Sequence, residues 1–251
     1  GKKLYVLDSN WRNNGGGIYT LTIGCDGTLK EEGKLVAAKL PYAATFVDGQ
    51  RLLLAARDVG SSQAGHDAHL VELSQGAVQS GTDAFGDDEA IVSNVALTHD
   101  GRYGLLSDNS AYSRKGGDRV AVVSLDTQSG ALSPVQILPN LEDPVWIVTS
   151  PHDNAAIVLG AQADSVWVLN YDPSSRTPFT LRGKLAATSA TLLPGVAVMI
   201  RRGSLEGRVL ISENTQLRQV HFAKDGSVKE IAVHSFGTGV KAIPGALGVT
   251  P

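Results

Sequence analysis

The sequence predicts an all-β fold, a β-propeller built from four-stranded antiparallel blades, and three repeated features lead to this prediction. Short apolar strands recur about every 50 residues along the 251-residue chain, a period typical of propeller blades. Turn signals separate the strands, and the helical spacing of apolar residues is nearly absent. The unit repeats five times, so we expect one domain, residues 1–251, with five blades.

The first repeated feature is an apolar strand that directly follows a turn. We assign it as the second strand of each blade, because a further apolar stretch precedes it in the later units. It occurs as KKLYVLDSN (2–10), RLLLAARD (51–58), RYGLLSDN (102–109), NAAIVLGAQ (154–162) and RVLISEN (208–214).

The second repeated feature is a two-residue turn between the third and fourth strands. Turns of the Asp-Gly type permit positive φ and join antiparallel strands tightly. The turns are Asp26-Gly27, Gln75-Gly76, Ser129-Gly130, Ser174-Ser175 and Asp225-Gly226.

The third repeated feature is the first strand of each blade. It reads AATFVDG (43–49), VALTHDG (95–101) and WIVTSPHDN (146–154), and in the fifth unit only PGVAVMIRRG (194–203) occupies this place. The chain ends in GALGVTP (245–251), which would be the first strand of the blade that opens the chain. Pairing of these terminal strands would close the ring and cover an open sheet edge. A fragment of a longer ring, with six or seven blades, would give the same local pattern.

Three segments carry a resemblance to a known family. GKKLYVLDSN (1–10), THDGRYGLLSDN (98–109) and VVSLDTQSGALSPV (122–135) resemble the repeats of the YVTN and lactonase-like β-propellers. The resemblance runs along the whole chain and implies a propeller, with sugar-lactone hydrolysis as a candidate activity. Members with that activity commonly have seven blades, and no acid/base set of the family maps onto this chain.

Composition excludes several classes of function. The net charge of −3 shows no basic excess, so we expect no nucleic-acid partner. No apolar run reaches the roughly 18–20 residues of a membrane helix, so we expect no membrane span. The single cysteine, Cys25, excludes an intramolecular disulfide. The compartment stays open, and a periplasmic or extracellular location is favoured over the cytoplasm.

Long connections gather at one end of the predicted ring. In a four-stranded meander the second-to-third-strand loops and the blade-to-blade connections share one face. On this loop face the loops at 8–17, 57–67 and 108–118 are long, whereas those of units four and five are short. Because rigid scaffolds carry binding sites on such loops, the candidate ligand-binding residues are Asp8, Asn10, Trp11, Arg12, Arg57, Asp58, His66, Asp108, Asn109, Tyr112 and Arg114.

The candidate residues are compatible with three functions. The first is a non-enzymatic module that binds a small polar ligand or a protein through these loops. The second is a lactonase-like hydrolase, with a loop carboxylate or His66 as the base and an Arg that stabilises the oxyanion. The third is a scaffold that meets a partner protein through its outer surface. The same loop residues would also suit an ordinary solvated surface.

No cofactor is predicted, and two segments, one with histidines and one acidic, are candidates for a metal site. His66, Asp67 and His69 offer transition-metal ligands, but residues three apart in a strand point to opposite faces. Both histidines can therefore bind one ion only if His66 lies in the loop. The acidic segment DAFGDDEA (83–90) lacks the spacing of a calcium loop and is interpreted as a solvated turn.

Overall fold

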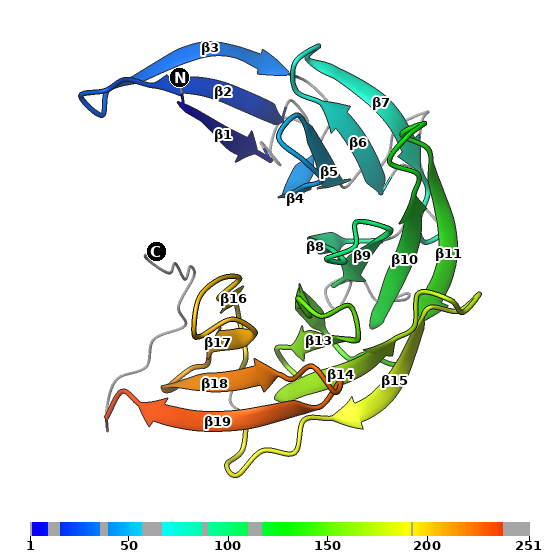
Figure 1. The fold of residues 1–251 in the computed structure, drawn as a ribbon, viewed down its shortest axis with the longest axis vertical. Coiled ribbons are helices and arrows are strands. Elements are labelled where there is room, and N and C mark those ends of the chain that lie inside the picture. Colours follow the sequence, from blue (N-terminus) through cyan, green and yellow to red (C-terminus); the bar gives the residue numbers. More distant parts are fainter. Residues whose placement is uncertain are drawn as a thin grey trace.

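The computed structural model describes residues 2–9, 16–35, 40–56, 67–86, 90–109, 117–191 and 193–237. Within these ranges the chain forms β-strands and no helix. The strands make five antiparallel sheets, four with four strands and one with three. The sheets follow one another around an arc, with the first strand of each four-stranded sheet nearest the centre (Figure 1).

Each sheet is a meander in which consecutive strands pair, as the sequence predicts. We number the sheets 1 to 5 along the chain. Sheet 1 contains β1 (Lys2–Asp8), β2 (Gly17–Ile23) and β3 (Leu29–Leu35). Sheet 2 contains β4 (Pro41–Phe46), β5 (Arg51–Ala56), β6 (Ala68–Glu72) and β7 (Ala77–Thr82). Sheet 3 contains β8 (Val92–Leu97), β9 (Tyr103–Asp108), β10 (Arg119–Leu125) and β11 (Leu132–Leu138).

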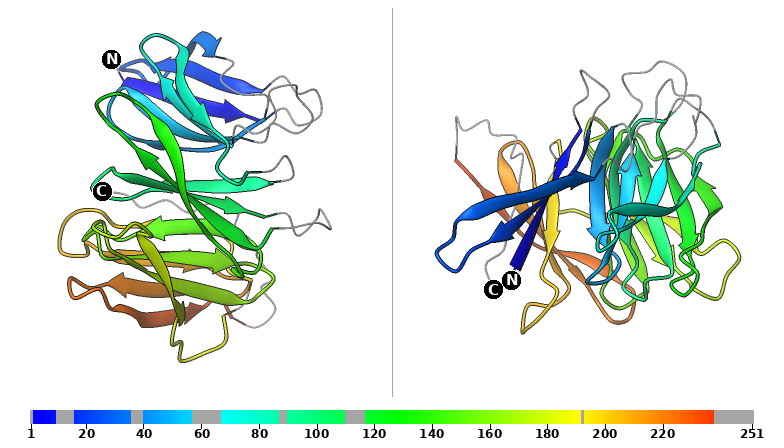
Figure 2. Two further views of the ribbon diagram at one scale, coloured as in Figure 1. Left: turned by 90° about the vertical axis from the view of Figure 1, so that its right-hand side faces the viewer. Right: turned by 90° about the horizontal axis from the view of Figure 1, so that it is seen from above.

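The last two sheets repeat the pattern. Figure 2 shows from two further sides how the five sheets stand around the arc. Sheet 4 contains β12 (Pro144–Thr149), β13 (Ala155–Gly160), β14 (Ser165–Tyr171) and β15 (Phe179–Lys184). Sheet 5 contains β16 (Ala197–Met199), β17 (Arg208–Ser212), β18 (Gln216–Phe222) and β19 (Val228–Ser235). The part of the chain described here contains no helix able to cross a bilayer.

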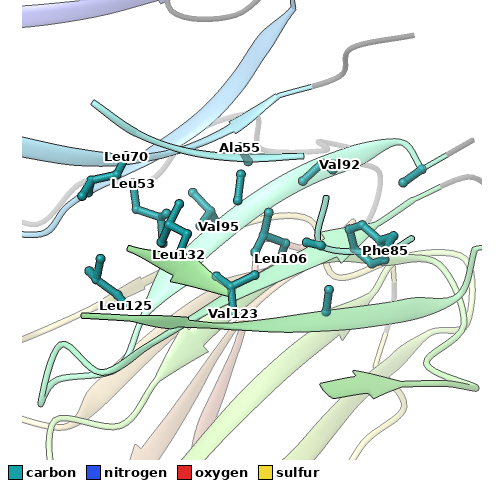
Figure 3. Close-up of a cluster of buried hydrophobic side chains, with 14 residues drawn as sticks. Leu53, Ala55, Leu70, Phe85, Val92, Val95, Leu106, Val123, Leu125 and Leu132 are labelled. Carbon is teal, nitrogen blue, oxygen red and sulfur yellow. The ribbon is translucent and has the colours of Figure 1, made fainter. Parts of the chain in front are cut away.

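The core lies between consecutive sheets. In β5, Leu53 and Ala55 pack toward sheet 3, whereas Leu52 and Leu54 pack toward sheet 1. Figure 3 shows the cluster between sheets 2 and 3, where Leu53 meets apolar side chains of sheet 3. Because both faces of an inner sheet are covered, its strands are apolar at successive positions rather than at alternate ones. Each fully buried Leu contributes about 1.5–3 kcal/mol.

A β-bulge recurs where the last two strands of each sheet pair, which are β2 and β3 in sheet 1 and the third and fourth strands in the other sheets. In all five sheets the register shifts at the same place, so one outer-strand residue has no partner. Bulges increase the local twist of a strand, which matches the curvature of the outer strands in Figure 1. The unpaired residues are Glu32, Gln79, Val135, Arg182 and Ile231.

The connections between the last two strands of the sheets contain the turn chemistry that the sequence predicts. In four of them an Asp Oδ1 accepts the backbone N–H two residues further on, at 2.8–3.0 Å. Hydrogen bonds from Ser or Thr hydroxyls and from backbone N–H groups hold the pKa of these carboxyls below the usual range. The four residues are Asp26, Asp126, Asp172 and Asp225.

Blade number and ring closure remain predictions. Sheet 1 has three strands, and the segment 245–251 that would complete it lies outside the described residues. The four core clusters join sheets 1 and 2, 2 and 3, 3 and 4, and 4 and 5. Among the described residues no such cluster joins sheets 5 and 1.

Candidate functional site

The first strands of sheets 2 to 5 surround a central cavity of about 500 Å³. Side chains from β4, β8, β12 and β16 line it. Each of these strands starts at the loop face, so Tyr42, Asn94 and Trp146 lie near that end of the cavity. Arg201 follows β16 and lies toward the opposite end, which carries the tight turns.

A bulge recurs at the loop-face end of three of these lining strands. Register shifts leave Tyr42 in β4, Ser93 in β8 and Val145 in β12 without a partner on the second strand. Bulges re-aim side chains and are frequent beside functional sites. Tyr42 lines the cavity with half of its surface exposed. The recurrence shows that this edge of the cavity has the same local backbone in three consecutive sheets.

Hydrogen bonds hold β8 and β12 side by side in the cavity wall. The Asn94 Oδ1 atom accepts the backbone N–H of Ile147 at 3.0 Å. The Thr149 hydroxyl donates to the Leu97 carbonyl at 2.7 Å. These bonds satisfy polar side chains within the wall, so the wall is set before any ligand enters.

Aliphatic side chains make up most of the cavity lining, and aromatic, polar and cationic side chains lie among them. Arg201 is the charged residue among the described lining residues, and partial burial lowers its pKa from the ordinary value. An arginine stays protonated at neutral pH in spite of such a shift. No Asp, Glu or His occurs among the described residues that line the cavity. The walls can therefore bind hydroxyl groups and anions, but a general base would have to come from elsewhere.

Three of the predicted loop-face residues lie in the described part of the chain. Asp108 is fully buried at the end of β9, where its Oδ2 atom meets Arg119 Nε at 2.8 Å. Its Oδ1 atom accepts the Ile91 N–H at 2.8 Å. Asp108 thus fixes the connection that precedes β8, and Arg119 also lies 4.8 Å from the centre of the Phe85 ring.

The other two described residues differ in environment. Asp8 lies at the end of β1 with Lys34 Nζ 3.8 Å from its carboxylate. Asn109 follows β9 and donates its backbone N–H to the Ile91 carbonyl at 2.9 Å. Its side-chain Oδ1 is buried and has no hydrogen-bond partner among the described residues. The remaining candidates lie outside the described residues, namely Asn10, Trp11, Arg12, Arg57, Asp58, His66, Tyr112 and Arg114.

The proposed metal ligands are separated by the start of β6. His69 is a buried strand residue, and Asp67 is buried directly before the strand. Burial raises the pKa of Asp67 to about 7, with a further rise from Asp83 and an opposing effect of backbone N–H bonds. His66 lies outside the described residues. Within the described ranges no three His, Cys, Asp or Glu side chains are placed to hold a metal ion.

Sequence reasoning missed the structural role of an aspartate that directly precedes the third strand in three sheets. Asp67 Oδ2 accepts the N–H groups of Ala84 and Phe85 at 3.0 and 3.1 Å. Asp118 Oδ1 accepts the Asp143 N–H at 2.8 Å, and Asp164 Oδ1 accepts the Leu193 N–H at 2.6 Å. Each carboxylate therefore anchors the connection to the next sheet. The sequence signal that could have revealed this role is an Asp directly before the third strand in three of the five units.

Asp143 is a further buried carboxyl on the loop face. Its Oδ2 atom accepts the Gln162 N–H at 2.7 Å, whereas the buried Oδ1 has no hydrogen-bond partner in the described part of the chain. Burial raises the pKa of this carboxyl, and the nearby carboxylates of Asp118 and Glu142 add to the rise. Asp143 does not line the cavity.

The fold is shared with several solved structures. A protein from Bacteroides uniformis, named as a proposed 6-phosphogluconolactonase, matches 100% of this chain with 14% identity and a TM-score of 0.71. The periplasmic gluconolactonase PpgL from Pseudomonas aeruginosa matches 93% with 16% identity and a TM-score of 0.64. Sqt1 from Chaetomium thermophilum matches 93% with 12% identity and a TM-score of 0.66.

The chain spans only part of these proteins: 72% of the first, 69% of the second and 58% of the third. No family model and no curated protein sequence matches the chain. At identities this low, the likeness shows the fold and leaves the chemistry to the site.

Proposed function

We propose that this chain is a lactonase-like propeller that binds a sugar lactone in the central cavity and hydrolyses it. The observation that carries the proposal is the cavity of about 500 Å³, which falls within the usual size of small-ligand sites. Tyr42 and Trp146 offer flat apolar faces to a sugar ring, and amide and hydroxyl groups lie beside them. The lactonase names of two similar structures support the same proposal.

Hydrolysis of a lactone adds one water across the ring ester. The water oxygen bonds to the carbonyl carbon, the bond from that carbon to the ring oxygen breaks, and the ring oxygen takes up a proton. The protein must remove a proton from the water and stabilise the oxyanion. We assign the base to the loop face, with His66, Asp8 and Asp58 as candidates, and the oxyanion to a loop arginine, Arg12, Arg57 or Arg114.

Asp108 is a poor choice for the base. Both of its oxygens are engaged, one by Arg119 and one by a backbone N–H, and the side chain is fully buried. We therefore assign Asp108 and Asn109 a supporting position, in which they hold the start of the loop that carries Tyr112 and Arg114.

The proposal also covers the repeat type and the location. We assign the five units to the YVTN type of propeller repeat on the residues of 1–10, 98–109 and 122–135. We favour export, because one of the similar structures is a periplasmic protein by name.

A second candidate is a module that binds a polar ligand or a protein without turnover. One observation favours it: the described cavity lining contains no carboxylate and no imidazole. A cavity of this kind can bind a sugar or sugar acid, whereas hydrolysis depends on the loops.

The first experiment measures acid release from D-glucono-1,5-lactone in a pH-stat at pH 6.5, with the rate without protein subtracted. The proposal requires acid release that is proportional to protein concentration and lost in the Trp146→Ala variant. Trp167→Ala is the matched control, because Trp167 lies in β14 and does not line the cavity.

A parallel thermal-shift measurement separates the two candidates. A ligand at a hundredfold excess over its Kd stabilises the folded state by about 2.7 kcal/mol. Stabilisation by the lactone or by gluconate without acid release would favour the binding module. Absence of both effects would contradict a sugar-acid site in the cavity.

A further inference from the structure

Two neighbouring residues of β8 contribute polar side chains to the wall of the central cavity. Ser93 and Asn94 both line the cavity, although successive side chains of a regular strand point to opposite faces. The bulge accounts for this arrangement, because the register shift between Val92 and Asn94 inserts Ser93 as an extra residue, and a bulge re-aims side chains. The bonds that each side chain makes within the wall determine which group it offers to a ligand.

The Ser93 hydroxyl offers a hydrogen-bond acceptor. Its Oγ atom lies 2.8 Å from the Oγ atom of the buried Ser107 and 3.2 Å from the Pro144 carbonyl oxygen of sheet 4. A carbonyl only accepts, so both bonds exist together only when Ser107 donates to Ser93 and Ser93 donates to Pro144. A hydroxyl oxygen has two lone pairs, and Ser107 occupies one. Among the described residues nothing else bonds to Ser93, so the second lone pair remains for a ligand.

The Asn94 amide offers a donor beside this acceptor. Its Oδ1 atom accepts the Ile147 N–H at 3.0 Å, which identifies the other terminal atom of the amide as the Nδ2 donor. Within the described part of the chain Nδ2 has no hydrogen-bond partner. The bond to Ile147 also holds the amide in one orientation, so the donor is in place before a ligand enters.

A hydroxyl group is the part of a sugar that matches an acceptor and a donor side by side. One hydroxyl can donate to Ser93 Oγ and accept from Asn94 Nδ2 at the same time. An ester carbonyl or a carboxylate only accepts, so it could bond to Asn94 but would leave Ser93 without a partner. A buried polar group that loses its partner costs free energy, so the pair favours a hydroxyl over these groups.

The direction of the Ser93 hydroxyl favours binding over nucleophilic attack. A serine nucleophile needs a base that takes its proton, whereas the Ser93 proton points to the Pro144 carbonyl. The described residues that line the cavity include no carboxylate and no imidazole. Ser93 is therefore suited to hold a ligand group in place.

We propose that Ser93 and Asn94 form a hydroxyl-binding subsite that makes the central cavity specific for sugar-like ligands. The inference rests on the proposed function, because it concerns the same cavity and the same class of ligand. A lactone bound in this way turns a ring hydroxyl, and not its ester carbonyl, toward β8. The subsite thereby orients the ligand as well as selecting it.

The test combines a protein variant with ligands that lack one hydroxyl group. Calorimetry measures the binding of D-gluconate and of its 2-, 3-, 4-, 5- and 6-deoxy analogues to the wild type and to Ser93→Ala. We expect Ser93→Ala to weaken gluconate binding about tenfold, through the loss of one hydrogen bond. Ser80→Ala is the matched control and should bind gluconate as the wild type does. The Ser80 hydroxyl also donates to a carbonyl of the following sheet, that of Gly130 at 2.6 Å, but Ser80 does not line the cavity.

The deoxy analogues separate the two halves of the subsite. One analogue should bind the wild type about a hundredfold more weakly than gluconate, because it loses the bonds to both Ser93 and Asn94. Ser93→Ala should not weaken that analogue further, and it should still prefer gluconate over it about tenfold through the Asn94 bond.

Each other outcome contradicts a stated part of the argument. Equal weakening of gluconate and every analogue by Ser93→Ala would overturn the subsite and leave the proposed function standing. Loss of all preference for gluconate in Ser93→Ala would overturn the role of Asn94. If Ser93→Ala does not fold, the wild type still decides, because the absence of any analogue that binds at least tenfold more weakly would overturn the subsite. If neither gluconate nor the lactone bound the wild type, the proposed function itself would fall, and the subsite with it.

Discussion

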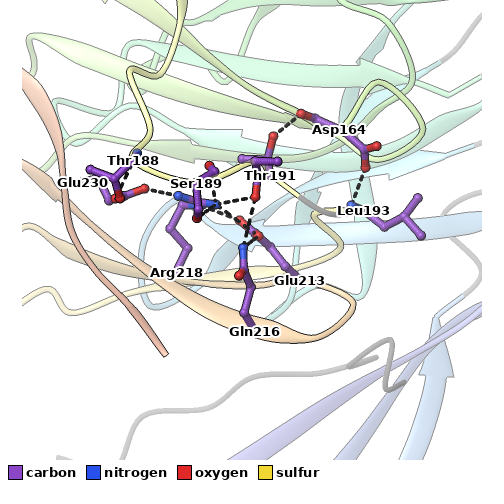
Figure 4. Close-up of polar contacts among 10 residues, drawn as sticks. Asp164, Thr188, Ser189, Thr191, Leu193, Glu213, Gln216, Arg218 and Glu230 are labelled. Atoms are coloured by element: carbon purple, nitrogen blue, oxygen red, sulfur yellow. Dashed lines mark hydrogen bonds and ion pairs between the residues drawn. The ribbon is translucent and has the colours of Figure 1, made fainter. Parts of the chain in front are cut away.

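Arg218 and Glu213 form an ion pair in which both side chains are fully buried, with Arg218 Nε 2.5 Å from Glu213 Oε1. Arg218 lies in β18 and Glu213 directly follows β17 (Figure 4). The guanidinium also contacts Glu230 of β19 and donates to the Ala190 carbonyl at 3.0 Å. One side chain therefore ties sheet 5 to the connection between β15 and β16.

Removal of the arginine should be costly. Arg218→Met keeps much of the side-chain volume but leaves the Glu213 carboxylate buried without its cation. Breaking one partner of a buried pair typically costs about 3–5 kcal/mol. We expect the free energy of unfolding in urea to fall by about that amount. The double variant Arg218→Met, Glu213→Gln should lose less, because the fully buried Glu213 charge is removed together with its cation, and equal losses in the single and double variants would contradict this explanation.

A glycine in sheet 3 marks a close approach between sheets. Gly130 has φ of +74°, and a Cβ atom there would lie 2.4 Å from the Gln79 side chain. Gly130→Ala should therefore destabilise the protein by about 1–3 kcal/mol, chiefly through backbone strain, because the end of the flexible Gln79 side chain can move aside. In a double-mutant cycle, Gln79→Ala should relieve the clash and so restore the part of the stability that the clash removes. The backbone strain should remain. Full additivity of the two substitutions in urea unfolding would show that the approach is unimportant.

The sequence was sufficient to predict the strands and turns that depend on residues close together in the chain. RYGLLSDN became β9 (Tyr103–Asp108), and the Asp26-Gly27 turn lies between β2 and β3 as expected. In each case the short apolar run and the turn chemistry act within one unit. The short β16 (Ala197–Met199) corresponds to the least regular first strand, PGVAVMIRRG.

The sequence was insufficient where distant segments meet. The cavity takes side chains from four sheets, so the proximity of Tyr42, Trp146 and Arg201 depends on how the sheets pack. Likewise Asp164 accepts the N–H of Leu193, 29 residues further on, because the path of the connection places it there. Of the predicted loop-face site, Asp108 proves to be a buried partner of Arg119, which its loop context did not indicate.

Asp67 should make stability depend on pH. Its pKa is raised by burial from 3.8 to about 7, so the folded state binds more protons than the unfolded state between these values. The contribution of Asp67 to the free energy of unfolding is therefore complete below about pH 4. It is lost as the pH rises through 7, at no more than about 1.4 kcal/mol per pH unit. Asp67→Asn keeps the acceptor for the Ala84 and Phe85 N–H groups but cannot titrate.

We expect urea unfolding at pH 4.5, 5.5, 6.5 and 7.5 to show a wild-type stability that falls relative to Asp67→Asn across this range. Asp83→Asn is the control, since loss of the neighbouring carboxylate should reduce the fall without abolishing it. Parallel pH curves for the wild type and Asp67→Asn would show that the carboxyl titrates normally in the folded state.

Arg201 should discriminate between a neutral lactone and its acid product. It is the cation among the described residues that line the cavity, so its guanidinium can pair with a carboxylate but gains less from an uncharged ester. We expect Arg201→Met to weaken the binding of gluconate about tenfold by calorimetry, which corresponds to about 1.4 kcal/mol, and to change lactone binding less. Arg202→Met is the matched control, because the adjacent Arg202 does not line the cavity. Equal losses of gluconate affinity in the two variants would indicate a general effect of surface charge. If Arg201→Met alone weakened the binding of both ligands, the guanidinium would instead contact a group that the lactone and the acid share.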